Sequence, residues 1–348
     1  MMNSKRAVSL SLVLVFLCSF LLFGCAPKEK RFEATITGYF DTVTTIVAYM
    51  EDKAAFDEEV QNIANELKAY DAMSDAYSSA SVNNIKTIND KAGSGEPVKV
   101  NLFIIDMLLT AKEAYKITNG AVNVALGSVT SIWRAYISNG INDASFSKVP
   151  SAQKLSEAAL HTDIEKVIID TENSTVYLED SEMRLDVGAF AKGYAASLLI
   201  YSAKERGVDS MLINIGGAVS AIGTRADASA WSVATQDPRN DSETIVNLKL
   251  TDLSVSTSGD YQRYYEVNGE RYHHVIDPQT LMPSKNAVAV TVIATNPILA
   301  DYMSTALMIM SLKDATALAE SIEGIEAMWV TDSGDIFTTS GFNAYITK

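Results

Sequence analysis

Histidine, cysteine and positive charge are scarce in this chain of 348 residues. It has three histidines and two cysteines, and 28 lysines and arginines stand against 43 aspartates and glutamates, which leaves a net charge of −15. Nucleic-acid binding requires clustered positive charge that displaces counterions, so this balance argues against a nucleic-acid partner. With seven prolines and a hydrophobic fraction of 47%, the chain is neither of low complexity nor disordered, and its length suits one large domain or two closely joined ones.

The N-terminus has the order of segments that is typical of an exported protein. Two basic residues, Lys5 and Arg6, precede an apolar run from Ala7 to Phe23, as in a secretory signal peptide. The run ends in Leu22-Phe23-Gly24-Cys25, which resembles a bacterial lipobox. An uncleaved N-terminal anchor is the alternative, because the run is at the lower limit of what crosses a bilayer as a helix.

We therefore expect three parts: a lipoprotein signal peptide over residues 1–24, a polar tether over 25–31 and a single domain over 32–348. Lipid on Cys25 would anchor the domain to the cytoplasmic membrane, on its outer, extracytoplasmic face. Cys18 leaves with the signal peptide, so no thiol remains for a disulfide or a metal site.

Strand candidates cluster along the rest of the chain and do not alternate regularly with helices. This favours an α+β fold with mixed or antiparallel sheets and flanking helices over a doubly wound parallel sheet. Apolar periodicity and capping residues predict helices over 52–70, 102–119, 152–160 and 190–206, and one that starts at Asn296-Pro297. Strands are expected over 32–50 with a break at Gly38, over 167–169, 175–177, 211–215 and 219–222, within 231–276, and over 288–294.

Asp301 and Thr305 lie four residues apart on the helix expected after Pro297, so their side chains point from one face. A carboxylate and a hydroxyl offer the hard oxygen ligands that Mg²⁺ or Ca²⁺ prefers. Two such residues are a weak signal by themselves. The alternative is a surface aspartate and a threonine that bonds back to the carbonyl of residue 301.

A segment rich in small residues, Asp186-Val-Gly-Ala-Phe-Ala-Lys192-Gly193-Tyr194, opens the helix expected over 190–206. Small side chains let the backbone approach a ligand, and a helix N-terminus favours anionic groups. Lys192 would add a point charge for a phosphate. The segment is neither a Walker loop nor Gly-x-Gly-x-x-Gly, so an ordinary strand-to-helix turn is the alternative.

Two of the three histidines, His273 and His274, are adjacent. On a strand, adjacent side chains face opposite sides, so only one of them is expected to enter a site. A histidine near Asp277 is a candidate general base, and a paired structural histidine is the alternative. The third histidine, His161, is expected to be solvated.

Five ordered motifs together resemble the ApbE family, the flavin transferases that move FMN from FAD onto proteins. The resemblance runs from about Thr37 to Ala327. It is carried by Leu185-Asp-Val-Gly-Ala-Phe-Ala-Lys-Gly-Tyr-Ala195, Asn214-Ile-Gly-Gly217, Thr257-Ser-Gly-Asp-Tyr-Gln-Arg-Tyr264, His274-Val-Ile-Asp-Pro-Gln-Thr280 and Ala300-Asp-Tyr-Met-Ser-Thr305. It implies an ApbE-like, T-fold-related α+β architecture, Mg²⁺ as the cofactor and FAD as the substrate.

The resemblance also implies a role for each matching residue. Asp301, Thr305 and the backbone carbonyl of Ala189 would bind Mg²⁺, and Lys192 would hold the FAD diphosphate. His274 would be the base that deprotonates a threonine or serine hydroxyl on an acceptor redox protein, so that FMN is transferred and AMP leaves. The residues implied to line the flavin and adenine pockets are Tyr77, Gly127, Ser128, Val129, Asp186 and Ile276.

Two further hypotheses remain open on the sequence. With water in place of the acceptor hydroxyl, the same site would be an FAD pyrophosphatase that gives FMN and AMP. A lipoprotein that binds flavin or another solute without catalysis is the third. The chain departs from the family pattern on the flavin side, at Phe40-Asp41-Thr42, where Met-Gly-Thr is common, at Arg134-Ala-Tyr136, where Gly-Phe-Gly is common, and in the spacing of Met73-Ser-Asp-Ala-Tyr77.

Overall fold

The computed structural model describes residues 29–143, 145 and 147–347. The predicted signal peptide and the predicted lipidation site Cys25 lie outside the described residues, as does most of the tether. In the part of the chain that is described, no helix is long and apolar enough to cross a membrane.

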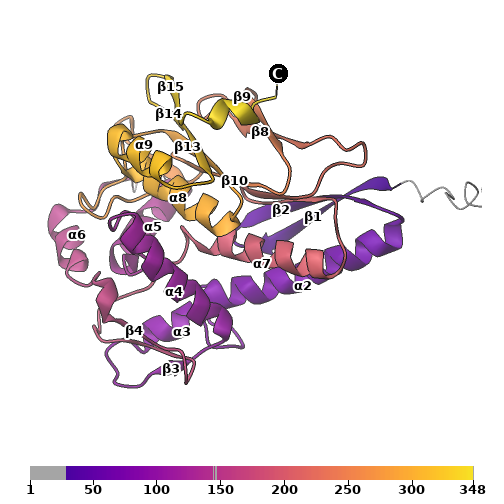
Figure 1. The fold of residues 1–348 in the computed structure, drawn as a ribbon. Helices are drawn as coiled ribbons and strands as arrows, with labels where there is room; N and C mark the ends of the chain where they lie inside the picture. Colours follow the sequence, from indigo (N-terminus) through magenta and orange to yellow (C-terminus); the bar gives the residue numbers. More distant parts are fainter. Residues whose placement is uncertain (1–28, 144, 146, 348) are drawn as a thin grey trace, which may run out of the picture.

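An eight-stranded sheet forms the centre of the molecule (Figure 1). Its strands run in the order β1, β2, β6, β7, β10, β13, β14 and β15, and every neighbouring pair is antiparallel. Their bounds are β1 Lys30–Tyr39, β2 Thr42–Met50, β6 Met211–Ile215, β7 Ala218–Ile222, β10 Ser254–Gly259, β13 Ala289–Ala294, β14 Ile325–Val330 and β15 Ile336–Thr338. The predicted α+β class with antiparallel sheets and flanking helices is confirmed.

Both faces of this sheet are covered, because its strands carry apolar side chains on both sides. In β2, the neighbours Ile46 and Val47 point to opposite faces, and both are buried. One face packs against three helices, α2 Lys53–Ser74, α7 Ala191–Glu205 and α8 Pro297–Ile309. The other face packs against a hairpin of β8 Trp231–Gln236 and β9 Thr244–Leu250.

A second group of elements packs on this helix layer, away from the sheet (Figure 1). It contains α3 Ile85–Asp90, α4 Leu102–Ile117, α5 Gly127–Asn142 and α6 Ala152–Ala159, with a small sheet of β3 Val98–Lys99, β5 Thr175–Leu178 and β4 Val167–Asp170. Leu108 of α4 shares one hydrophobic core with Phe190 before α7 and Met303 of α8. The other elements are η2 Ile164–Lys166, β11 Tyr264–Val267, β12 Glu270–His273, α9 Leu312–Ser321 and η3 Phe342–Tyr345.

The elements that differ from the prediction have local causes. The predicted break at Gly38 is wrong: β1 runs on to Tyr39 with a shift in register, and the chain turns at Phe40 and Asp41. Gly127–Val129, for which the sequence predicts no helix, form the first turn of α5, whose start has no side-chain cap that the sequence could reveal. The elements in segments for which the sequence predicts none are α3, α5, α9, η2, η3, β3, β14 and β15.

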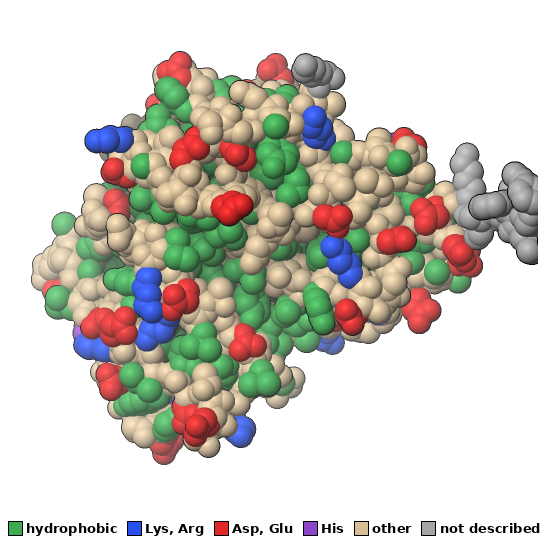
Figure 2. All heavy atoms as spheres, viewed as in Figure 1, with side chains coloured by type: hydrophobic (Ala, Val, Ile, Leu, Met, Phe, Trp, Pro, Cys, Tyr) green, Lys and Arg blue, Asp and Glu red, His purple; other side chains and the backbone are tan. Residues whose placement is uncertain are grey.

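The net charge of −15 shows on the surface as widely dispersed acidic side chains. Figure 2 shows them over the whole face seen in Figure 1, with basic side chains lying singly or in small groups among them. Apolar side chains gather near the centre of that face. The two signs of charge are therefore mixed on this face rather than separated into opposite sides.

Arg206 joins the C-terminal end of α7 to α2 through the buried carboxylate of Glu59. Glu59 is 4% exposed and accepts hydrogen bonds from Arg206 Nε at 2.8 Å and Nη2 at 2.7 Å. Arg206→Met should lower the free energy of unfolding by about 3 kcal/mol, because it leaves a buried carboxylate without its cation. Lys204→Met, which removes an exposed ion pair with Asp252, should cost less than about 1 kcal/mol. Urea denaturation of both variants measures the difference, and equal losses would contradict this role for Arg206.

Candidate active site

The start of α7 touches the side of α8 at Gly193 and Asp301. The amide of Gly193 donates a hydrogen bond to Asp301 Oδ2 at 2.7 Å. A Cβ on residue 193 would lie 2.4 Å from the Cβ of Asp301 and 2.7 Å from the carbonyl oxygen of Pro297, so only glycine allows this approach. The contact satisfies one of the first-turn amides of α7, which have no acceptor within their own helix.

Asp301 is a buried carboxylate, 5% exposed, with both oxygens engaged. Besides Gly193, Ser256 on β10 donates to it, from Oγ to Oδ1 at 2.9 Å, and no lysine or arginine among the described residues pairs with it. Thr305, one turn later on α8, is half-buried, and its hydroxyl lies 3.1 Å from that of Ser258 on the same strand. Asp301 and Thr305 therefore lie on one face of α8, as predicted, and that face packs against β10.

Asp301 and Thr305 offer side-chain oxygens, the ligand type that a hard cation prefers. A buried carboxylate without a basic partner is normally balanced by a cation. Thr305 offers a hydroxyl, and the third ligand that the resemblance implies is the backbone carbonyl of Ala189, which is half-buried in the turn before α7. Mg²⁺ prefers oxygen ligands and fills its remaining positions with water and phosphate oxygens. Among the described residues, no three or more His, Cys, Asp and Glu side chains form a group that could hold a metal ion.

Asp186, at the other end of the turn before α7, organises a second group of side chains. Its Oδ2 accepts hydrogen bonds from the hydroxyls of Tyr77 at 3.1 Å and Thr130 at 2.7 Å, and its Oδ1 accepts one from the amide of Gly188 at 2.9 Å. Desolvation, followed by the negative charge of Asp186, raises the pKa of the Tyr77 hydroxyl above its ordinary value, so this hydroxyl stays a donor. The structure thus brings Tyr77 and Asp186 together.

The predicted residues Gly127, Ser128 and Val129 form the first turn of α5. A Cβ on Gly127 would lie 2.3 Å from the carbonyl oxygen of Arg184, so this turn lies directly against the segment that leads to α7. Ser128 donates to a carbonyl of α6 at 2.8 Å. The side chains of Val129 and Ile276 are buried in one shared core. Because both are occupied in packing, ligand contacts from these two residues would have to come from their backbones.

His273 and His274 face opposite sides, as predicted. His273 is buried, and its partners assign a neutral ring in which Nε2 donates to the carbonyl of Ser284 at 2.8 Å and Nδ1 accepts from the amide of Val275 at 3.2 Å. Of the two alternatives that the sequence leaves open, a histidine paired with Asp277 is not found, and His273 has the contacts of a structural histidine. The two oxygens of that carboxylate accept hydrogen bonds from the two residues after Pro278, which close its own turn.

Of the two adjacent histidines, His274 is the one whose side chain is accessible to a ligand. The residue is exposed to solvent, although many protein atoms lie close to its ring. This desolvation, with smaller contributions from the neighbouring His273 and from the positive charges of Arg263 and Lys192, lowers the pKa of His274 from 6.5 to about 3. The ring is therefore neutral at physiological pH and free to accept a proton. The charge of Lys192 acts on it, although 82 positions separate the two in the sequence (274 − 192).

Several residues of this site are not predicted from the sequence. Ser256 and Ser258 alternate along β10, and the period of two that puts both on the face toward α8 is a signal that could have identified them. Thr130 depends on α5, which the sequence does not predict. The solvated state expected for His161 is wrong, because its Nδ1 lies 2.9 Å from Asp180 Oδ1.

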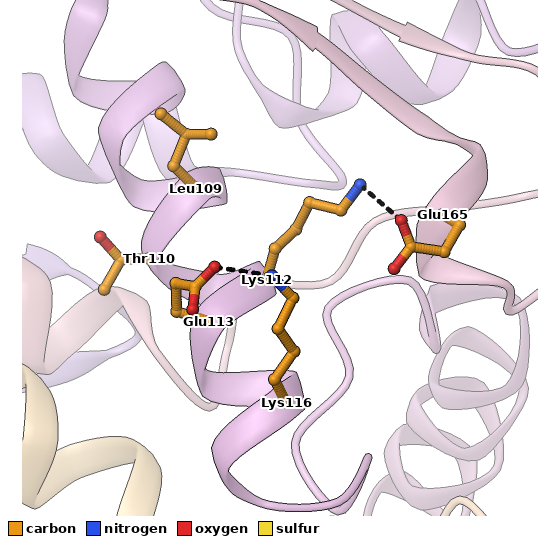
Figure 3. A pocket seen from close by; sticks show the side chains of 6 residues that line it. All are labelled: Leu109, Thr110, Lys112, Glu113, Lys116 and Glu165. Carbon is orange, nitrogen blue, oxygen red and sulfur yellow. Dashed lines mark hydrogen bonds and ion pairs between the residues drawn. The ribbon is translucent and has the colours of Figure 1, made fainter.

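A separate hollow of about 450 Å³ lies beside α4 (Figure 3). It is lined by Leu109, Thr110, Lys112, Glu113, Lys116 and Glu165. Its charged side chains pair with one another, Lys112 with Glu165 at 3.5 Å and Lys116 with Glu113 at 2.8 Å. None of the predicted site residues lines this hollow, so it does not belong to the candidate site.

Gly193→Ala tests the contact between α7 and α8. Alanine in an unobstructed helix is about 1 kcal/mol more stable than glycine. At residue 193 the change should instead lower the free energy of unfolding by about 1–3 kcal/mol, because the new methyl overlaps Asp301 and the Pro297 carbonyl. Urea denaturation measures this, with Ser197→Ala on the same helix as a control that should stay within about 0.5 kcal/mol of the parent. A gain in stability at residue 193 would contradict the close approach.

Known proteins match this chain over most of its length. A model of the ApbE family matches residues 40–329. The FAD:protein FMN transferase of Klebsiella pneumoniae (strain 342) is 32% identical over 258 residues, which cover 74% of this chain and 77% of that protein. The FAD:protein FMN transferase of Escherichia coli (strain K12) is 29% identical over 285 residues, which cover 80% of this chain and 78% of that protein.

Solved structures agree with these matches. The crystal structure of the ApbE protein from Thermotoga maritima has a TM-score of 0.81 at 27% identity, and the match covers 92% of this chain and 100% of that one. The apo form of the flavinyl transferase ApbE from Pseudomonas stutzeri has a TM-score of 0.76 at 26% identity, and covers 91% and 97%. The ordered motifs, the family match and the shared fold place the chain in one family: it belongs to the ApbE family.

Proposed function

We propose that this protein is a Mg²⁺-dependent flavin transferase, which moves FMN from FAD to a threonine or serine hydroxyl of an acceptor protein and releases AMP. The observation that carries the proposal is the buried Asp301 carboxylate, which has no basic partner among the described residues. It binds the amide of Gly193 in the first turn of α7, and Lys192 precedes Gly193 in the chain. The related FAD:protein FMN transferases support the reaction class, since the matches span about three quarters of each chain.

The chemistry requires one bond to form and one to break at the FMN phosphorus. The acceptor oxygen forms a bond to that phosphorus, the bond to the bridging oxygen of the diphosphate breaks, and AMP leaves with the bridging oxygen. The proton of the acceptor hydroxyl goes to the neutral ring of His274. Lys192 offsets the negative charge of the diphosphate. Mg²⁺, held by Asp301, Thr305 and the Ala189 carbonyl, would neutralise the charge that gathers on the leaving group.

Hydrolysis of FAD is the second candidate, and the exposure of His274 favours it. Water that reaches this ring could replace the acceptor hydroxyl, and the products would then be FMN and AMP. Binding of flavin without catalysis would leave no use for His274 or for the pair of Asp301 and Thr305.

We further propose that the protein is held at the outer face of the cytoplasmic membrane by lipid on Cys25, where membrane-bound redox proteins would be its acceptors. The support is the order of basic residues, apolar run and lipobox-like motif in residues 1–25. Cell fractionation tests this placement: Cys25→Ser should move the protein out of the membrane fraction, and retention there would favour the uncleaved anchor.

Intact mass of a candidate acceptor, measured after incubation with the protein, FAD and Mg²⁺, tests the reaction. Transfer should add the mass of one FMN to the acceptor and release one AMP, and removal of Mg²⁺ by a chelator should abolish both. AMP without an acceptor adduct would assign hydrolysis. If FAD stays intact and no AMP forms with any acceptor in a panel, flavin binding without catalysis is the function that remains.

His274→Ala tests the base. It should slow transfer by about 10²–10⁴-fold and leave FAD binding within about twofold, because the ring acts on the acceptor hydroxyl. His161→Ala, outside the site, is the matched control and should not change the rate.

The pH profile gives a second test of the base. As pH falls, activity is lost only where His274 becomes protonated, so the acid limb of kcat should lie well below the ordinary value of 6.5. An unchanged rate in His274→Ala would contradict this role, and an acid limb near 6.5 would contradict the lowered pKa of the ring.

A further inference from the structure

Asp41 occupies a turn that the surrounding structure holds in an uncommon conformation. Phe40 and Asp41 both have left-handed backbones, with φ of 53° and 51°. Bulky residues such as Phe40 seldom adopt this conformation, which persists where neighbouring contacts impose it. The amide of Phe40 donates to Asp71 Oδ1 at 2.8 Å, and its ring packs against the core between the sheet and the helices. The turn therefore presents the Asp41 carboxylate in one fixed direction.

Two arginines from distant parts of the chain meet this carboxylate. Arg134 Nη2, from α5, lies 3.6 Å from Asp41 Oδ2, and Arg263 Nη1, from the segment between β10 and β11, lies 3.9 Å from the same oxygen. Arg263 Nη2 also donates to the backbone carbonyl of Asp41 at 3.3 Å. One carboxylate therefore lies between a guanidinium group from a helix and a guanidinium group from a loop.

Arg134 in turn covers the ring of Tyr77. Its guanidinium carbon lies 4.0 Å from the ring centroid. Thr130, four residues earlier on α5 and on the same face, donates to the Asp186 oxygen that also accepts from the Tyr77 hydroxyl. Helix α5 thus contacts Tyr77 in two ways. Arg134 lies on the face of its ring, and Thr130 binds the same Asp186 oxygen as its hydroxyl.

The ring of Tyr77 needs these contacts because its own segment gives it little support. Tyr77 lies between α2 and α3, in a stretch without helix or strand, where Asp75 closes a turn by accepting from the amide of Tyr77 at 2.7 Å. The residue is 38% exposed, so its ring can still receive a planar group of a ligand. The direction in which the ring faces therefore depends on Arg134.

We propose that Asp41 is a positioning residue for FAD: it fixes the guanidinium of Arg134 on the ring of Tyr77, and so sets the surface on which a planar ring of FAD is received. The assignment rests on the proposed function. An arginine side chain on an exposed helix face has many conformers, and an ion pair with a rigid turn selects one of them. Two of the segments in which the chain departs from the family pattern, at Asp41 and Arg134, are therefore joined in space to the third, at Tyr77.

The FAD dissociation constant, with KM and kcat for transfer, tests this. Asp41→Asn and Arg134→Gln should each raise the dissociation constant and KM for FAD about fivefold, the effect expected when an exposed cation–π contact of about 1 kcal/mol is lost, and leave kcat at saturating FAD within about twofold. Arg134→Lys should not restore binding, because an ammonium group cannot lie flat on the ring. The double variant should bind FAD no more weakly than Arg134→Gln alone, because Asp41 acts through Arg134.

Asp332→Asn is the matched control. Asp332 is an exposed aspartate that pairs with another arginine, Arg239, at 3.1 Å, and its loss should leave FAD binding unchanged. Wild-type affinity in Asp41→Asn, additive effects in the double variant, or a fall in kcat with KM unchanged would each overturn the proposal. A wild-type protein that binds FAD but transfers no FMN would instead count against the proposed function, and the binding measurements would still decide the role of Asp41.

Discussion

The contact between the first turn of α7 and the buried side of α8 is the constraint on which the candidate site depends. Asp301 replaces the water that would otherwise bind the amide of Gly193, and Ser256 on the central strand β10 holds its second oxygen. Two helices and the middle of the main sheet are thereby fixed at one carboxylate. The contact also helps to set the positions of Lys192 and of the turn before α7, because both lie close to Gly193 in the chain.

The turn before α7 connects the two sides of the site. Asp186 at its start gathers Tyr77 and Thr130, and Gly193 shortly after its end meets Asp301. A ligand with a planar ring system at one end and a diphosphate next to it has the shape that such an arrangement can receive. The short distance along the chain keeps the aromatic and the metal-binding sides in a constant relation, because seven peptide bonds, most of them within a turn and a helix, separate them (193 − 186).

The positive charges near the candidate site act over short distances. The chain carries a net charge of −15, and its acidic side chains are dispersed over the surface, so long-range attraction does not favour an anionic substrate such as FAD. Lys192, Arg263 and Arg134 come from three separate elements and lie near His274 or Tyr77, where they supply positive charge over short distances. Desolvation, and after it the charges of Arg263 and Lys192, lower the pKa of His274 and keep its ring neutral, which a proton acceptor requires.

The sequence by itself determined which local elements form and which family the motifs resemble. Capping residues and apolar periodicity located α2, α4, α6, α7 and α8, because these signals act between residues close in the chain. The tertiary structure alone decided which side chains meet. Gly193 and Asp301 are 108 positions apart and Tyr77 and Asp186 are 109 apart, and no local pattern encodes such a pairing. Asp277, which the sequence offers as a partner for a histidine, binds within its own turn instead, and Asp41 meets Arg134 only because a strained turn and an unpredicted helix end up side by side.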